Sequence, residues 1–256
     1  MGAKEFDSYY GALYGDRWDG LRNALLKPAE KDTYTLRLTT PYIMDRASIM
    51  AARSLRLPEH GLMLDACAAP GGKTLVLAAE SSPRLKILAN EPSSERRRRL
   101  QNVLDESLDA ETRSRITVSG FDAAALAAKK SEHGRFDGIL LDAPCSSERH
   151  LLSNQKYLAK WTEARPRFLS KRQWALLSAA FLLLKNDSCL VYVTCAISAE
   201  ENDRVAARLA VKYGSRVTLD RPDFSEGEDT EFGKIILPDK AAGMGPMYIA
   251  RFYKIA

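Results

Sequence analysis

The chain has 256 residues, of which 45% are hydrophobic and 28% are charged. These proportions are ordinary for a globular protein and exclude a disordered or fibrous chain. No stretch approaches the roughly 18 consecutive apolar residues of a membrane span. The formal net charge of +5 is compatible with a polyanionic partner, but many enzymes are equally basic.

The cysteine content and the N-terminus indicate a compartment. The four cysteines lie far apart, so we expect free thiols in a reducing environment rather than a disulfide scaffold. The segment from Met1 to Asp7 lacks the layout of a secretion signal and is too acidic for an organellar presequence. We therefore expect a soluble protein of the cytoplasm or, in a eukaryote, of the mitochondrial matrix.

The N-terminal part differs from the rest of the chain. Residues 1–40 are rich in aromatic side chains and include a segment of helical spacing, 18–26. Pro28 ends this segment because proline cannot continue a helix. We predict a short N-terminal helical extension over 1–40 and one main domain over 41–256. Helical periodicity at 42–56 predicts that this domain begins with a helix.

Short apolar runs separated by helix-length segments dominate the main domain. The five runs are 62–66, 85–91, 116–122, 136–142 and 189–195. This alternation predicts an α/β fold with a doubly wound, mostly parallel sheet. Right-handed crossovers place the carboxyl ends of parallel strands at one edge, where ligands bind. Four of the runs end in or beside a carboxylate, and the fifth ends in a cysteine.

The first run leads into a loop of small residues, 65–74, that contains Gly71 and Gly72. Glycines let the backbone approach a ligand closely, and the N-terminus of the following helix favours a negative group. The end of this loop matches the end of a phosphate-binding P-loop. That motif needs a glycine five positions before Gly72, where Cys67 stands, so a P-loop is disfavoured.

Acids after the next runs indicate the ligand. The acid that ends the second strand of a doubly wound sheet accepts hydrogen bonds from ribose hydroxyls, and Glu91 has this place. Asp122 can reach the edge of an adenine ring, and Asp142 ends the fourth run. Without a phosphate-binding motif, the set indicates a nucleoside that bears an amino acid, S-adenosyl-L-methionine. Any one of these acids could instead be a helix cap.

Two cysteines, Cys145 and Cys195, are expected on adjacent elements of the ligand-binding edge. A free cysteine is usually a small buried hydrophobic residue. A thiolate at this edge, however, suits methylation of cytosine at carbon 5. Its addition to carbon 6 makes carbon 5 nucleophilic, which divides one difficult step into two. A nearby cation such as Lys73 would favour the thiolate.

The loop 65–74, the Asp142–Cys145 element and Thr194–Cys195 resemble the Sun (Fmu) family of RNA cytosine-5 methyltransferases. The resemblance covers essentially the whole chain. The segments 90–96, 145–150 and 245–248 are similar to the mitochondrial small-subunit rRNA branch and its bacterial relatives. This implies a Rossmann-like methyltransferase fold, S-adenosyl-L-methionine as cofactor, RNA such as ribosomal RNA or a ribosomal particle as partner, and no metal.

The resemblance also implies roles for matching residues. Cys195 would be the nucleophile, Cys145 would assist release of the methylated RNA, and Asp142 would hold the cytosine edge. The cofactor-binding residues would be Gly71, Gly72, Lys73, Glu91, Arg96, Asp122 and Asp142. The chain departs from the family where Glu91 replaces the more usual aspartate and Ala196 the more usual serine. The second change removes a hydroxyl beside the nucleophile.

Other functions stay open. A DNA cytosine-5 methyltransferase would use Cys145 as nucleophile, but no segment resembles a DNA target-recognition domain. An amino-group methyltransferase needs an aromatic residue where Cys145 stands. The remaining alternatives are a tRNA cytosine-5 methyltransferase and a non-catalytic, RNA-binding ribosome-assembly factor with a relic cofactor pocket. Without an obvious RNA-binding domain, we expect specificity to come from folded rRNA, a ribosomal particle or a partner protein.

Cations and aromatic residues alternate over 156–174, which suits phosphate neutralisation and base stacking. Helical spacing nevertheless favours core packing for Phe168 and Trp174. Arg149 and His150, just after Cys145, are the better candidates to contact the target strand. The target base must be unpaired or flipped out of its stack to reach a thiol.

Overall fold

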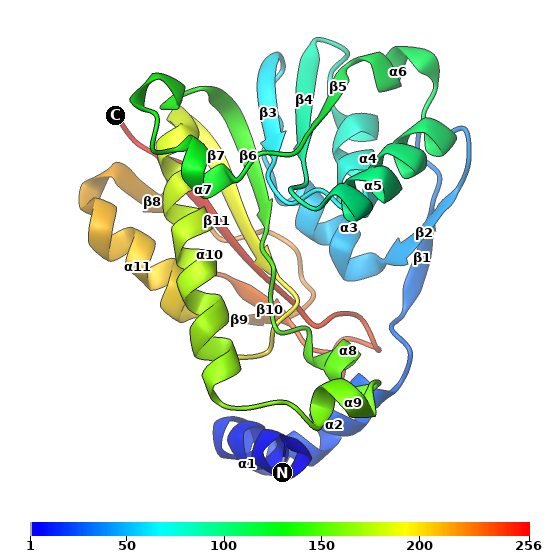
Figure 1. The fold of residues 1–256 in the computed structure, drawn as a ribbon, viewed down its shortest axis with the longest axis vertical. Coiled ribbons are helices and arrows are strands. Elements are labelled where there is room, and N and C mark those ends of the chain that lie inside the picture. Colours follow the sequence, from blue (N-terminus) through cyan, green and yellow to red (C-terminus); the bar gives the residue numbers. More distant parts are fainter. Residues whose placement is uncertain (1) are drawn as a thin grey trace.

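A nine-stranded sheet forms the centre of the computed structural model, which describes residues 2–256 (Figure 1). The strand order is β5-β4-β3-β6-β7-β11-β10-β9, and β8 also pairs with β11. The parallel strands are β3 (Gly61–Asp65), β4 (Leu85–Asn90), β5 (Ile116–Ser119), β6 (Phe136–Asp142) and β7 (Leu184–Thr194). The antiparallel edge contains β8 (Val217–Leu219), β9 (Glu228–Asp229), β10 (Lys234–Ile236) and β11 (Met247–Lys254). The predicted doubly wound α/β fold is confirmed, with one antiparallel edge.

The strand order reverses between β3 and β6, because the chain runs outward through β4 to β5 and then returns to β6. Ligands of doubly wound sheets bind at such a reversal, beyond the carboxyl ends of the strands. The loops after β3 and β6 flank this point. They contain the predicted glycine loop and Cys145, so the fold brings both motifs to the expected place.

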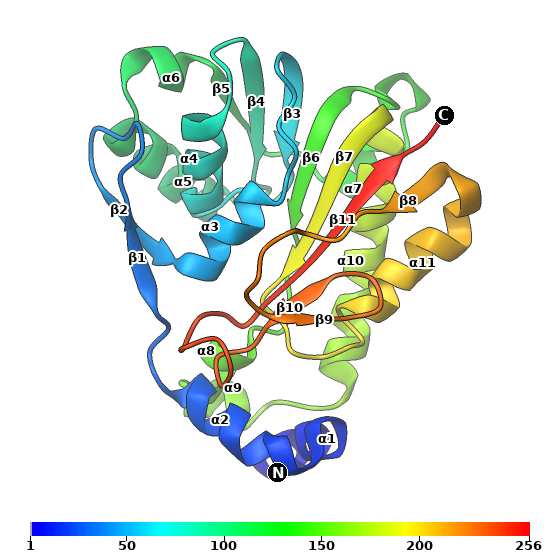
Figure 2. The ribbon, with the colours of Figure 1, turned by 180° about the vertical axis from the view of Figure 1, so that it is seen from behind.

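Helices cover both faces of the sheet (Figures 1 and 2). On one face lie α3 (Arg46–Arg53), α4 (Gly72–Glu80) and α5 (Ser94–Ser107). On the other face lie α7 (Ala123–Leu126), α10 (Ala164–Leu183) and α11 (Asp203–Tyr213). The short helices are α6 (Ala110–Ser114), α8 (Glu148–Leu152) and α9 (Gln155–Leu158). No helix in the described residues is both long enough and apolar enough to cross a membrane.

The N-terminal helices α1 (Gly2–Tyr14) and α2 (Trp18–Leu26) lie against α8 and α9 (Figure 2). Phe6, Tyr10 and Trp18 form a separate buried cluster with Trp161 and side chains of α8. The aromatic residues that mark this part of the sequence are therefore packing residues. The cluster fixes the N-terminal segment beside the carboxyl edge of the sheet.

The helix predicted over 42–56 is wrong in its first residues. Tyr42–Asp45 forms strand β2, which pairs antiparallel with β1 (Lys31–Tyr34), and α3 begins only at Arg46. Asp45 caps this helix, because its Oδ1 accepts a hydrogen bond of 2.7 Å from the backbone N–H of Ala47. The β1–β2 pair also crosses residue 40, where the sequence suggests a boundary. That boundary stays a prediction.

Candidate active site

Two cavities meet at the carboxyl edge of the parallel strands. The smaller, of about 90 Å³, lies over the glycine loop and is lined by Asp65, Cys67 and Gly72 among others. The larger, of about 590 Å³, includes Cys195 in its wall. Ser48, Lys73 and Asp142 line both cavities, so these side chains stand between the two spaces.

The glycine loop is shaped by close packing. Gly71 has a φ of +122°, which favours glycine, and it precedes the first turn of α4. A Cβ atom on Gly72 would lie only 2.9 Å from the ring of Tyr42. Asp65, at the other end of the loop, accepts a hydrogen bond of 2.7 Å from Thr74 Oγ1. Burial raises the pKa of Asp65 to about 7. The loop therefore brings the N-terminus of α4 to the smaller cavity.

Glu91 follows β4 and is only 2% exposed. Its Oε1 accepts a hydrogen bond of 2.9 Å from Ser93 N. Its Oε2 lies 3.2 Å from an Arg96 nitrogen as an ion pair, but no hydrogen-bond partner for it exists among residues 2–256. Arg96 donates instead to the carbonyl oxygen of Ala69 in the glycine loop, at 2.9 Å. Glu91 lines neither cavity as described, and its Oε2 is a buried acceptor with an ion-pair partner but no hydrogen-bond partner in the described residues.

The structure does not bring Asp122 to these cavities. Its side chain is exposed and caps α7, with Oδ1 accepting from Ala124 N at 2.9 Å. Asn90, which the sequence reasoning missed, is fully buried at the end of β4. Its side chain hydrogen-bonds Ala66 O at 3.2 Å and Phe121 N at 3.0 Å. Asn90 thus links the loops that follow β3 and β5. The signal in the sequence was an amide side chain at the end of an apolar strand.

Lys73 and Asp142 form an ion pair of 2.8 Å between the two cavities. Ser48 Oγ lies 3.5 Å from the same ammonium group. Burial disfavours the charge of Lys73, but Asp142 and then Cys195 outweigh this effect, and the pKa of Lys73 is raised. A largely buried, charged ammonium therefore faces the space in front of Cys195.

The two thiols lie in contact. Cys145 Sγ is 2.8 Å from Cys195 Sγ, and Cys195 N donates a hydrogen bond of 3.2 Å to Cys145 Sγ. Ser147 Oγ lies 3.0 Å from Cys195 Sγ. The hydrogen bond to Cys195, followed by burial, raises the pKa of Cys145 well above its usual range. Only Cys195 of these two lines the larger cavity as described.

The family model of the 16S rRNA methyltransferase RsmB/F matches residues 52–253. The chain belongs to this family. The prediction of membership in the Sun (Fmu) group of RNA cytosine-5 methyltransferases is confirmed by this match and by similar proteins.

Three relatives show the range of the family. The 5-cytosine rRNA methyltransferase NSUN4 of Bos taurus is 29% identical over 86% of this chain and 61% of its own. Ribosomal RNA small subunit methyltransferase F of Aeromonas salmonicida is 34% identical over 70% of this chain and 37% of its own. A mitochondrial tRNA (cytosine(34)-C(5))-methyltransferase of Mus musculus is 30% identical over 83% of this chain and 63% of its own. The chain thus spans less than two thirds of each relative.

Solved structures show the same fold. A methyltransferase homologue from Pyrococcus horikoshii has a TM-score of 0.74 and 21% identity, covering 96% of this chain and 93% of its own. NSun6 from the same organism, solved with SFG, has a TM-score of 0.71 and 24% identity, covering 90% of this chain and 57% of its own. The predicted Rossmann-like methyltransferase fold is confirmed.

In this RsmB/F family member, segments distant in sequence wall the larger cavity. The N-terminal part contributes Leu25, Leu26, Lys27 and Pro28. The first residue of β11 and the two residues before it contribute Met247, Gly245 and Pro246. Arg149 Nη1 and Nη2 donate to Lys27 O at 3.2 Å and Gly243 O at 3.0 Å. Arg149 therefore joins the two walls, and no local sequence pattern predicts this packing of distant segments.

The predicted RNA-contact stretch divides into two kinds of residue. Phe168 is 70% exposed, so the expectation that it packs in the core is wrong. Trp174 packs against the second core cluster beneath Arg208, as helical spacing predicts. His150 is exposed at the larger cavity, with its ring centroid 5.9 Å from that of Tyr157. Within the described residues, no group of side chains is arranged to hold a metal ion.

Proposed function

We propose that this chain is an S-adenosyl-L-methionine-dependent RNA cytosine-5 methyltransferase that acts on ribosomal RNA. The contact between Cys195 and Cys145, beside a cavity shared with the Lys73–Asp142 pair, is the main support. The family match and the rRNA methyltransferases among the similar proteins support the substrate class. A tRNA is the second candidate, because one similar protein is a tRNA methyltransferase. The compartment and a protein partner stay predictions.

The described residues fit the proposed cofactor. Glu91 Oε2 lacks a hydrogen-bond partner in the described residues and suits a ribose hydroxyl, and the glycine loop presents a helix N-terminus to the smaller cavity. The proposed cofactor-binding residues are Gly71, Gly72, Lys73, Glu91, Arg96, Asp142 and, on the adenine side, Asp122. When bound, S-adenosyl-L-methionine supplies the methyl group. Since Asp122 caps α7, we expect its contribution to be the smallest.

The proposed chemistry begins at Cys195. Its thiolate adds to carbon 6 of a flipped-out cytosine, which places electron density on carbon 5. The ammonium of Lys73 lines the same cavity as Cys195 and is the cation proposed to favour this thiolate. Asp142, held by Lys73, accepts a hydrogen bond from the cytosine edge. The chain thus positions the base between the thiol and the cofactor cavity.

Cys145 acts in the second half of the reaction. The hydrogen bond and charge of Cys195 are among the causes that raise the pKa of Cys145. Once Cys195 Sγ is bonded to carbon 6, this opposing charge is gone, so Cys145 can release its proton to solvent. Its thiolate then accepts the proton from carbon 5. The bond between Cys195 Sγ and carbon 6 breaks, and its electron pair returns to sulfur.

Bisulfite mapping of total RNA tests the function. RNA from cells that lack the protein is incubated with the chain and S-adenosyl-L-methionine, and we expect new 5-methylcytosine in rRNA. Methylation of tRNA alone would favour the second candidate. RNA binding without any new 5-methylcytosine would identify a non-catalytic assembly factor.

Replacement of each thiol tests the mechanism. Cys195→Ala is expected to give neither product nor covalent RNA adduct, because the nucleophile is absent. Cys145→Ala is expected to form an adduct that persists on a denaturing gel. Cys189→Ala is the matched control, because this thiol lies on β7 and lines neither cavity as described. The reverse pattern would make Cys145 the nucleophile, as in DNA methyltransferases.

A further inference from the structure

Two carboxylates lie buried behind the thiol-bearing loops. Glu148 begins α8, three residues after Cys145, and Glu201 lies in the loop that follows Cys195. Both residues are 0% exposed, and neither is in an ion pair of the described chain. A buried carboxyl group without a cation is costly, so its hydrogen bonds must account for its presence.

Each carboxylate holds the backbone next to the thiol of the other loop. Glu201 Oε2 accepts from Ser146 N at 2.9 Å, directly after Cys145. Glu148 Oε2 accepts from Ile197 N at 3.1 Å, two residues after Cys195. Each acid therefore links its own loop to the other loop by accepting a backbone hydrogen bond.

Gln173 of α10 adds a third connection. Its Nε2 lies 2.8 Å from Glu201 Oε2 and 2.9 Å from the carbonyl oxygen of Pro144, the residue before Cys145. Tyr10 of α1 donates a hydrogen bond of 2.5 Å to Glu148 Oε1. Side chains of α10 and α1 thus contact the same two acids that link the thiol-bearing loops.

The hydrogen atoms at Ser146 determine where a proton must lie. Ser146 Oγ contacts Glu148 Oε1 and also lies 2.5 Å from Glu201 Oε1. One hydroxyl has one hydrogen, so it cannot donate to both carboxylates. One of the two contacts is a hydrogen bond only if that carboxyl group is itself protonated.

The other contacts assign this proton to Glu201. Both oxygens of Glu148 already accept from donors, namely the hydroxyl of Tyr10 and the N–H of Ile197. Glu201 Oε1 faces only Ser146 Oγ among its described partners, so it is free to donate. The chain of donors is then Glu201 Oε1–H to Ser146 Oγ, and Ser146 Oγ–H to Glu148 Oε1.

We propose that Glu148, Ser146 and Glu201 form a proton-dependent brace that holds Cys145 and Cys195 at their working separation, an inference that rests on the proposed function. The acids are positioning residues, because they act through the loops and do not line either cavity as described. Loss of the proton leaves two carboxylates facing one hydroxyl. Their repulsion loosens the loops and separates the thiols.

The groups around Glu201 and Glu148 are consistent with a carboxyl proton on Glu201 that is kept at neutral pH. Burial, followed by the charge of Glu148, raises the pKa of Glu201 to about 8, and burial also raises that of Glu148. The titratable groups that face the pair are Tyr9, Tyr10 and Tyr14 of α1, Tyr192 of β7 and Cys145. All are neutral in their protonated forms, so none supplies a compensating positive charge.

Two isosteric variants give opposite expectations. Glu201→Gln can place its amide NH₂ where Oε1 donates and its carbonyl oxygen where Oε2 accepts, so it copies the protonated acid. Glu148→Gln must turn an NH₂ group toward the N–H of Ile197, which is a donor, or toward Tyr10, whose buried hydroxyl then loses its described acceptor. We expect Glu201→Gln to keep kcat within about threefold of wild type at pH 7 and Glu148→Gln to lower it at least about tenfold.

The pH dependence of kcat distinguishes the proposed brace from a merely structural role of the two acids. One pH unit above the pKa of Glu201, only about a tenth of the wild-type chains keep the proton. The kcat ratio of Glu201→Gln to wild type should therefore rise about tenfold there, with methyl transfer to total RNA as the readout. A flat ratio, or Glu201→Gln as damaged as Glu148→Gln, would overturn the brace.

Infrared spectroscopy tests the proton without RNA. At pH 7, the difference spectrum of wild type minus Glu201→Gln should show a carboxylic acid band, because protonated Asp65 contributes equally to both proteins. Absence of that difference would contradict the proton assignment even if both variants fold. If wild-type protein transfers no methyl group to RNA, the proposed function fails, and the infrared result alone decides the brace.

Discussion

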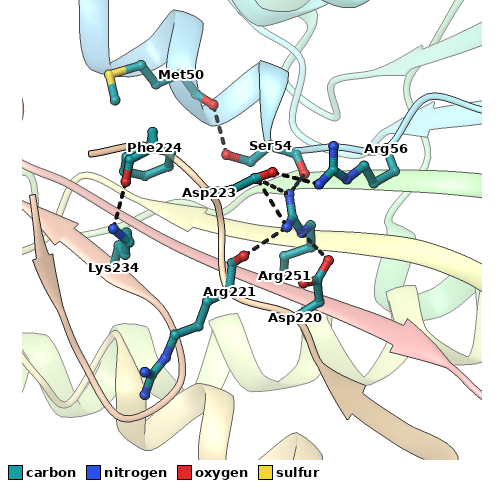
Figure 3. A network of polar contacts seen from close by, with 9 residues as sticks. All are labelled: Met50, Ser54, Arg56, Asp220, Arg221, Asp223, Phe224, Lys234 and Arg251. Atoms are coloured by element: carbon teal, nitrogen blue, oxygen red, sulfur yellow. Dashed lines mark hydrogen bonds and ion pairs between the residues drawn. The ribbon is translucent and has the colours of Figure 1, made fainter. Parts of the chain in front are cut away.

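Two buried cations of this chain have similar partners and very different surroundings. Arg251 on β11 is 2% exposed and forms ion pairs with Asp220 at 2.7 Å and Asp223 at 3.3 Å (Figure 3). It also donates to the carbonyl oxygens of Ser54 at 3.3 Å and Arg221 at 2.8 Å. Lys73 has one carboxylate partner and cavities on both sides of the pair. Protein groups enclose the arginine, although its Nε has no hydrogen-bond partner among residues 2–256, whereas the lysine borders two cavities with room for a ligand.

The cavity beside the Arg251 cluster also differs from the proposed active site. It has a volume of about 540 Å³ and is lined in part by Ser54, Asp223 and Phe224. None of the described residues in its wall is a cysteine. Size and charge are thus similar in the two regions. A nucleophile beside an incompletely paired ammonium is what distinguishes the proposed active site.

Lys73→Met should have the largest effect. Loss of the ammonium removes the charge that favours the Cys195 thiolate and the partner that holds Asp142, so kcat should fall about 10²- to 10⁴-fold. Stability should change little, because Asp142 borders both cavities and can be solvated there. Single-turnover methyl transfer and thermal unfolding measure the two effects. An unchanged rate would place Lys73 in the same structural class as Arg251.

Asp65 extends the comparison to a buried acid, because it hydrogen-bonds Thr74 and no cation pairs with it in the described chain. Burial raises its pKa to about 7, above its value of about 3.9 in an unfolded chain. The folded chain therefore holds a proton that the unfolded chain releases between these values. Stability should fall by about 1.4 kcal/mol per pH unit in this window.

Asp65→Asn should remove this pH dependence. The variant has no proton to release, so its stability relative to wild type should improve by about 2 kcal/mol between pH 5 and pH 7. Denaturant unfolding at both pH values measures the difference. A pH-independent difference would mean that Asp65 is already ionised in the folded chain.

Local sequence patterns predicted the strands and loops that carry the site residues. They did not predict contacts between segments that are distant in the sequence. Cys145, Cys195, Lys73 and Glu91 follow strands whose apolar runs are visible in the sequence. Glu148 and Glu201 look like surface acids, because only the folded chain places a serine between them. The same is true of the β1–β2 pair and of Leu25–Pro28 in the cavity wall. Helical spacing was also insufficient at Phe168, because an exposed aromatic residue can share the period of a core residue.

Arg251→Met tests the structural cation. Removal of the guanidinium leaves the buried Ser54 carbonyl without this donor, and we expect a loss of about 2 kcal/mol in unfolding free energy. The cost stays below that of a fully buried pair because Asp220 and Asp223 remain in contact with water. Arg56→Met is the matched control, because Arg56 pairs with Asp223 at the surface and should matter by less than about 1 kcal/mol. The kcat of the folded enzyme should be unchanged in both variants.

Glu91→Gln should have the smallest effect of these variants, and it extends the comparison to the proposed cofactor site. Glu91 Oε2 has no hydrogen-bond partner in residues 2–256, although it lies 3.2 Å from an Arg96 nitrogen. If a ribose hydroxyl occupies Oε2, exchange of the charged acceptor for an amide should weaken S-adenosyl-L-methionine binding about tenfold. Asp122→Asn should weaken it less, because that carboxylate is exposed and already caps α7. Calorimetric titration of both variants measures this order. A stronger effect at Asp122 would mean that the loop after β5 rearranges on binding, since the described position of Asp122 does not line either cavity.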